Sequence, residues 1–161
     1  MSILRWPDKR LRTAASPVEE ITEADRTAWD LMIKEMEAMP GVGLASVQVG
    51  YMRSLAVVDA SAERGQVIRM ANPRVLHESA KMNEHEEASP CLPGVFAKVS
   101  RPRAVTVEFM DETGERREKD FVGLWATSVQ HQIDHLAGKM YFDHLSRTKR
   151  AMLIKRAGKI A

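Results

Sequence analysis

The stretch that decides the fold runs from residue 130 to residue 138 and reads Gln-His-Gln-Ile-Asp-His-Leu-Ala-Gly. His131 and His135 are four residues apart, so in a helix they lie on one face with Cβ atoms roughly 5–6 Å apart. Two imidazoles in this arrangement can bind one divalent metal ion. Metallohydrolases place a glutamate directly after the first histidine as the general base, whereas this chain has Gln132 there. A helix with two chance histidines is the alternative interpretation.

Two other segments carry side chains suited to chemistry. Residues 41–48 read GVGLASVQ, where the glycines let a ligand approach the backbone and the Gln48 amide could donate to a developing oxyanion. Residues 86–94 read EEASPCLPG, and Cys91 could complete a Cys-His-His metal site with an open fourth position. The alternatives are a glycine-containing connection with a solvated glutamine, and a loop with a small buried cysteine.

Helices and strands around these segments predict an α+β fold, because the two types do not alternate strictly. Residues 1–21 are expected to form an irregular arm, since prolines interrupt it. Helices are expected over residues 22–39, 121–137 and 147–160. Strands are expected over residues 54–59, 66–71 and 104–110, with Asn72-Pro73 ending the second and a hairpin turn at residues 111–114 after the third. The last helix, residues 147–160, is basic and has no acidic residue.

Length and composition restrict the classes of protein to which the chain can belong. Its 161 residues predict one domain, residues 1–161, with one core. Lys plus Arg number 24 against 22 Asp plus Glu, and a net charge of +2 argues against a DNA-binding protein. The single cysteine excludes an intramolecular disulfide framework, and no stretch is long and apolar enough to span a membrane. A reducing cytoplasm is the expected compartment.

Taken together and in this order, the three segments resemble the motifs of the peptide deformylase family, G-x-G-L-A-A-x-Q, E-G-C-L-S-x-P-G and Q-H-E-x-D-H-L-x-G. The third motif matches at Gln130, His131, Asp134 and residues 135–138, apart from Ala137 at its variable position. The resemblance covers nearly the whole chain and implies small antiparallel sheets around a central helix that carries the two histidines. It also implies removal of the formyl group from N-terminal formyl-methionine of nascent polypeptides, with Fe²⁺, Zn²⁺ or a similar divalent metal.

The resemblance also assigns roles to residues of the first motif and to the last helix. Gln48 inherits the role of holding the oxyanion, and Gln132 stands at the position of the catalytic glutamate. Backbone groups around Val42, Gly43 and Leu44 would pair with an N-formyl-methionyl peptide as an added strand. In the family a C-terminal helix contacts the ribosome, so residues 147–160 could dock on ribosomal RNA, the alternative being a solvated charged face.

The second motif departs from the family pattern at its metal ligand. Aligning either Glu87 or Pro93-Gly94 with the family motif places Ser89 at the position of the family's cysteine ligand. Cys91 then lies where the family has serine, and Pro90 replaces a leucine whose N–H is the second oxyanion donor. We therefore expect Ser89, rather than Cys91, to lie closest to the two imidazoles.

These departures favour a deformylase-like protein with weak or lost catalysis and retained peptide binding. The competing hypothesis is an active metal-dependent deformylase in which a shifted loop lets Cys91, His131 and His135 bind the metal. In that case Glu86 or Glu87 is the obvious substitute for the missing base.

Overall fold

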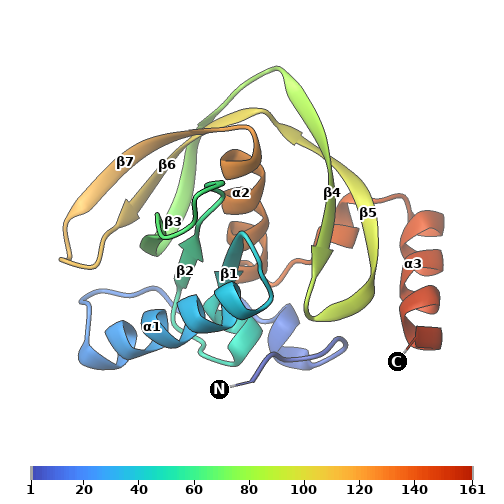
Figure 1. The fold of residues 1–161 in the computed structure, drawn as a ribbon, viewed down its shortest axis with the longest axis horizontal. Helices are drawn as coiled ribbons and strands as arrows, with labels where there is room; N and C mark the ends of the chain where they lie inside the picture. Colours follow the sequence, from blue (N-terminus) through green and yellow to red (C-terminus); the bar gives the residue numbers. More distant parts are fainter. Residues whose placement is uncertain (1, 161) are drawn as a thin grey trace.

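Helix α2 (Leu124–Leu136) lies at the centre of the molecule, between a five-stranded sheet and a two-stranded sheet (Figure 1). The computed structural model describes residues 2–160. The larger sheet is antiparallel throughout, in the order β1 (Gly43–Ala45), β2 (Leu55–Val58), β3 (Ile68–Glu78), β6 (Ala104–Met110) and β7 (Arg116–Val122). The smaller sheet is the antiparallel pair β4 (Met82–Ser89) and β5 (Leu92–Pro102). The expected α+β fold, with antiparallel sheets around a central helix, is confirmed.

The other helices begin and end at local sequence signals. Helix α1 (Glu23–Ala38) starts at a complete capping box in which Thr22 and Asp25 satisfy each other's backbone N–H. Helix α3 (Arg147–Ile160) has the expected bounds. Three short 3-10 helices complete the chain: η1 (Lys9–Arg12), η2 (Ser46–Val49) and η3 (Tyr141–His144). The first of them lies inside the arm expected to be irregular, where the Asp8 side chain caps it.

The predicted start of the central helix at Phe121 is wrong, because Phe121 and Val122 belong to the end of β7. Phe121 and Val122 pair with Val105 and Ala104 in the β6–β7 hairpin, so their backbone groups are used by the sheet. Gly123, at φ +65°, separates the strand from the helix, which begins at Leu124. The helix ends as expected, with Gly138 after it at φ +80°.

The predicted strand end at Asn72-Pro73 is also wrong, because β3 continues to Glu78. The register between β3 and β6 shifts between Ala71 and Arg74, which marks a bulge. Asn72 adopts φ +52° there, and its side chain accepts from Val18 N–H and donates to Val18 C=O. The bulge thus bends the strand and fastens the N-terminal arm to it rather than ending it.

The core consists of apolar clusters arranged around α2. One cluster joins α1 to β1 and β2 through Trp29, Met32 and Leu44. Another joins α2 to β3, β6 and β7, and a third joins β5 to α3 through Val99 and Leu153. The second of these clusters packs the larger sheet directly against the central helix. Within residues 2–160, no helix has the length and apolar character needed to cross a membrane.

Candidate active site

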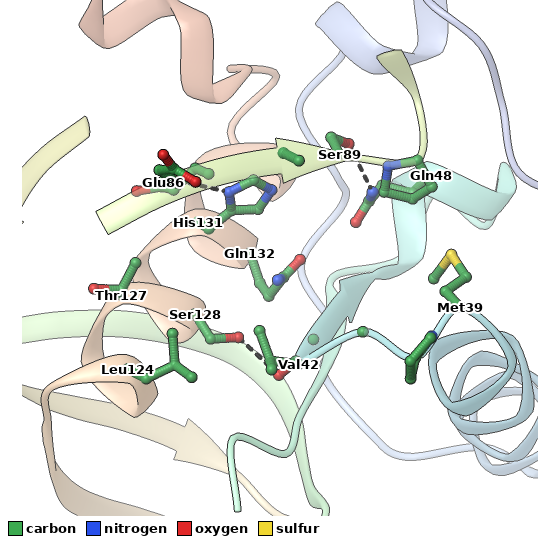
Figure 2. A pocket seen from close by; sticks show the side chains of 16 residues that line it. Met39, Val42, Gln48, Glu86, Ser89, Leu124, Thr127, Ser128, His131 and Gln132 are labelled. Atoms are coloured by element: carbon green, nitrogen blue, oxygen red, sulfur yellow. Dashed lines mark hydrogen bonds and ion pairs between the residues drawn. The ribbon is translucent and has the colours of Figure 1, made fainter. Parts of the chain in front are cut away.

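The two histidines of α2 lie with their ring nitrogens facing each other. His131 Nε2 is 3.2 Å from His135 Nε2, and both side chains are buried. Two metal–nitrogen bonds of about 2.0–2.1 Å at a tetrahedral angle separate their nitrogens by roughly 3.3 Å, so this spacing suits one shared ion. Gln132, next to His131 on the same helix, is 4% exposed and points into the space beside His131 (Figure 2).

A buried carboxylate from β4 orients His131. Glu87 Oε1 is 2.8 Å from His131 Nδ1, and Arg101 of β5 donates to both Glu87 oxygens at 2.7 and 2.9 Å. Arg101 also donates to Asp134 at 2.8 Å, which links the two-stranded sheet to α2. Burial raises the pKa of Glu87, but the hydrogen bonds from His131 and Arg101 outweigh it and hold that pKa below its usual value. Glu87 is therefore ionised and can only accept hydrogen bonds.

The ionised Glu87 places a proton on one nitrogen of His131. His131 Nδ1 carries that proton, because the Glu87 carboxylate can only accept a hydrogen bond. The Nε2 atoms of His131 and His135 share one hydrogen bond, while His135 Nδ1 has no partner among the described residues. Complete burial, with the neighbouring His131 and Arg101 as smaller causes, lowers the pKa of His135 well below its usual value. His135 is therefore in the neutral form that metal ligation requires.

Gln48 is held in place by its own backbone turn and by the loop after β4. Its Oε1 accepts from Ala45 N–H at 2.9 Å. Its Nε2 lies 3.3 Å from Ser89 Oγ and 3.6 Å from Cys91 Sγ (Figure 2 shows the bond to Ser89). Both amide hydrogens therefore have an acceptor within the chain.

Ser89 and Cys91 both contact Gln48 Nε2, but of the two only Ser89 is among the residues that line the cavity. Ser89 lines the cavity that also contacts His131 and Gln132. Cys91 is 1% exposed and packs in the apolar cluster with Leu92 and Tyr141. Burial raises the pKa of the Cys91 thiol, although the hydrogen bonds with Gln48 and Ser89 act in the opposite direction. Within the described residues, no group of three or more His, Cys, Asp or Glu side chains is placed to hold a metal ion.

A cavity of about 450 Å³ opens beside His131, between β1, the end of β4 and the first turns of α2. Gly43 forms part of its wall. A side chain does not fit at this position, since a Cβ there would lie 2.5 Å from Gln132 Nε2 and 2.6 Å from Ser128 Oγ. Of the residues expected at the site, Val42, Gly43, Gln48, Gln132 and His131 all line this cavity. Leu44 does not, since its side chain is buried in the α1 cluster.

Sequence reasoning missed two contributors to this site. Arg101 carries no local signal, because its role depends on pairing with residues 14 and 33 positions away. Thr127, one turn before His131, contacts His85 Nδ1 at 2.7 Å and so attaches β4 to α2 at a second point. The spacing of Thr127 from His131 could have placed it on the same helix face, but nothing in the sequence indicated its partner.

Comparisons with known proteins agree on one family. Residues 1–151 match the family model described as "Polypeptide deformylase". A peptide deformylase of Methylocella silvestris is 40% identical over 99% of this chain and 84% of its own length. The solved structure of a peptide deformylase from Legionella pneumophila has a TM-score of 0.92 at 36% identity, covering 99% of this chain and 94% of that one. That of Ehrlichia chaffeensis peptide deformylase in complex with actinonin has a TM-score of 0.93 at 31% identity, covering 99% and 96%.

Proposed function

Because the chain belongs to the peptide deformylase family, we propose that it binds N-formyl-methionyl peptides in its cavity but hydrolyses them slowly or not at all. The family reaction removes the formyl group from nascent polypeptides and normally uses a divalent metal. The observation that carries the proposal is the neutral wall beside the histidine pair. That wall consists of Ser89, Pro90 and Gln132, with Cys91 turned into the core.

The general base is missing from this wall. The Gln132 amide can orient a water molecule but cannot accept its proton at neutral pH. Glu87 lies nearby, but both of its oxygens already accept hydrogen bonds from Arg101 and His131. These bonds stabilise the charged carboxylate, so it is a poor acceptor for a proton from water. Glu86 is exposed at the rim. Loss of general base catalysis costs roughly 10²–10⁴-fold in rate.

Oxyanion stabilisation is weakened as well. Pro90 has no N–H to donate, and the two hydrogens of the Gln48 amide already face Ser89 and Cys91. Loss of one oxyanion donor costs about 2.7–4 kcal/mol of transition-state stabilisation.

The donor set supplies only two good metal ligands. The spacing of His131 Nε2 and His135 Nε2 suits an ion, but the third position offers the neutral hydroxyl of Ser89. A serine hydroxyl stays protonated near neutral pH, whereas a cysteine with a pKa of about 8.5 is readily deprotonated by a metal. The residues present therefore fit the family's divalent metal incompletely, and we expect weak, sub-stoichiometric binding of Fe²⁺ or Zn²⁺.

Peptide binding, in contrast, has its elements in place. Within residues 2–160, β1 is an edge strand of the larger sheet and β4 is paired only with β5, so each has an edge without a strand partner. The cavity lies between residues 41–43, at the start of β1, and residues 86–90, at the end of β4 and just after it, where an extended peptide can add as a strand. The Ehrlichia relative was solved with actinonin bound, which supports a ligand-binding groove in this fold.

The test is kcat/KM on a formyl-Met-Ala peptide, measured with Fe²⁺, Ni²⁺ or Zn²⁺ supplied. We expect the native chain to be far below the usual range of about 10⁴–10⁸ M⁻¹s⁻¹. Gln132→Glu alone should restore little, because it supplies only the base. Combining it with Ser89→Cys, Pro90→Leu and Cys91→Ser should restore much more than the sum of the parts, since these groups act as a unit. A native value within the usual range refutes the proposal and favours the active site built on Cys91.

A second proposal concerns α3, which carries the family's suggested contact with the ribosome. The helix has six Lys or Arg residues and no acidic residue, and Lys149, Lys155 and Arg156 are exposed. Such a face can neutralise RNA phosphates. Replacing Lys149, Lys155 and Arg156 by Glu should strongly weaken co-sedimentation with ribosomes and lower the salt dependence of the binding that remains. Unchanged co-sedimentation would show that the face is merely solvated.

A further inference from the structure

We propose that a second cavity, on the opposite face of α2 from the histidine pair, binds small primary aliphatic amines as their ammonium ions. Its volume is about 520 Å³, within the range of small-molecule sites. Helix α2 contributes Gln130, Ile133 and Asp134 to it, whereas other residues of the helix line the cavity beside His131. The two cavities share no lining residue within the described part of the chain, so this site does not depend on peptide binding or turnover.

Gln130 presents a hydrogen-bond acceptor to this second cavity. Its side chain is 8% exposed, and its Nε2 donates to the carbonyl groups of Ala126 and Pro102 at 3.0 Å each. Both amide hydrogens are therefore used inside the protein, and Oε1 is the polar atom left to face the cavity. This oxygen accepts no hydrogen bond from residues 2–160. A largely buried amide held in this orientation favours a ligand that brings N–H donors.

Two carboxylates border the same cavity. Asp134 uses one oxygen, Oδ2, for Arg101 at 2.8 Å and for His144 at 2.7 Å, while its Oδ1 has no partner among the described residues. Glu78, at the end of β3, is exposed and forms no ion pair within residues 2–160. Arg101 is the only Lys or Arg in the described lining, and the buried Glu87 already accepts two of its hydrogen bonds. The acceptors that remain free therefore carry negative charge, which a ligand cation can pair with.

The rest of the wall is apolar and favours an aliphatic group beside the charge. Met82 is 49% exposed at the cavity, and Val75 and Ile133 are partly buried in its wall. A bare metal ion leaves these side chains in contact with water, whereas the carbon chain of an alkylamine covers them. A primary ammonium group also has three N–H donors for the oxygens of Gln130, Asp134 and Glu78. The combination fits a primary aliphatic amine better than an inorganic cation.

The experiment titrates n-pentylamine into the isotope-labelled full chain and follows the backbone amide shifts by NMR. Two relatives of this probe separate its features: 1-pentanol has no charge, and trimethylpentylammonium keeps the charge but has no N–H. We expect n-pentylamine to bind with a dissociation constant of about 1 mM, which a ligand of this size can reach. Each relative should bind at least about tenfold more weakly, because it lacks the charge or the donors. The shifts should concentrate around Gln130 and Asp134 and leave Gly43 unchanged.

Three variants test the assigned acceptors. Gln130→Met has a similar volume but no acceptor, so it should weaken n-pentylamine binding about tenfold. Because this variant also removes the donors to Ala126 and Pro102, the exposed Glu78→Gln provides a second variant that leaves the packing intact. Loss of this charge should weaken binding about two- to fivefold, as for an exposed ion pair. Glu37→Gln, at an exposed position on α1 outside the cavity, is the matched control and should leave the dissociation constant unchanged.

Three results would overturn the proposal: equal affinity for n-pentylamine and either relative, shifts located in another part of the chain, or equal effects of Glu78→Gln and Glu37→Gln. If Gln130→Met does not fold, the comparison of the two glutamate variants decides. Binding and hydrolysis of formyl-Met peptides are measured separately, so neither fast nor slow turnover bears on this second cavity.

Discussion

The Arg101–Glu87 pair offers the sharpest test of how the site is held together. Both side chains are 4% exposed, and Arg101 also donates to Asp134. Arg101→Leu keeps an apolar stem in place but leaves the Glu87 carboxylate buried with only His131 as a partner. Removing one member of a buried ion pair costs about 3–5 kcal/mol, so we expect that loss in the free energy of unfolding. At about 2–4 °C per kcal/mol for a chain of this size, Tm should fall by about 6–20 °C.

Urea unfolding of four chains measures the coupling: native, Arg101→Leu, Glu87→Leu and the double variant. The double variant leaves no uncompensated charge at Glu87, and Asp134 keeps its contact with His144 at 2.7 Å. Its loss in the free energy of unfolding should therefore be smaller than the sum of the two single losses by about 2 kcal/mol or more. Unchanged m-values would show that all four chains unfold in the same two-state manner.

Arg74→Leu is the matched control. Its pair with Glu108 has the same 2.7 Å separation, but the Arg74 side chain is 71% exposed, so the loss should be within about 1 kcal/mol. A loss below about 1 kcal/mol for Arg101→Leu, or strict additivity in the cycle, would refute the reasoning that this buried ion pair between β4 and β5 stabilises the site.

Three other substitutions test separate parts of the structure. Gly43→Ala puts a Cβ 2.5 Å from Gln132 Nε2, so it should lower the free energy of unfolding in urea by about 1–3 kcal/mol and weaken formyl-peptide binding. Native values for both quantities would contradict the close contact between Gly43 and Gln132. Asp25→Asn removes the buried partner of Arg53, which is the main cause holding the pKa of Asp25 well below its usual value. Because that pKa is lowered in the folded state, the ionised Asp25 stabilises the native chain above about pH 3.9, and this stabilisation is lost as the pH falls. The variant should therefore be less stable than the native chain by about 2 kcal/mol at pH 7, and it should lose less stability below pH 4. Parallel curves of unfolding free energy against pH would contradict this. Tyr141→Phe removes a buried hydroxyl that has no hydrogen-bond partner among residues 2–160, so it should raise the free energy of unfolding by up to about 1 kcal/mol. A decrease of more than about 1 kcal/mol would contradict the absence of a partner.

Features that depend on neighbours in the chain were readable from the sequence. The capping box at Thr22 and Asp25 and the basic helix Arg147–Ile160 lie where local pattern placed them, as does the alternating strand Ala104–Met110. The spacing of His131 and His135 likewise places them on one face of α2. In each case the signal and the structure span a few residues, so no distant partner is needed to interpret it.

Tertiary structure decided the features that require distant segments to meet. β4 and β5 exist because each supplies the other's hydrogen bonds, and β3 continues through Asn72 because Val18 satisfies the bulge. Motif alignment could propose a register for Ser89, but its position on the cavity wall depends on the core into which Cys91 packs. Periodicity reports which face of an element is apolar; it does not report which other element covers that face, because that choice depends on the packing of the whole chain.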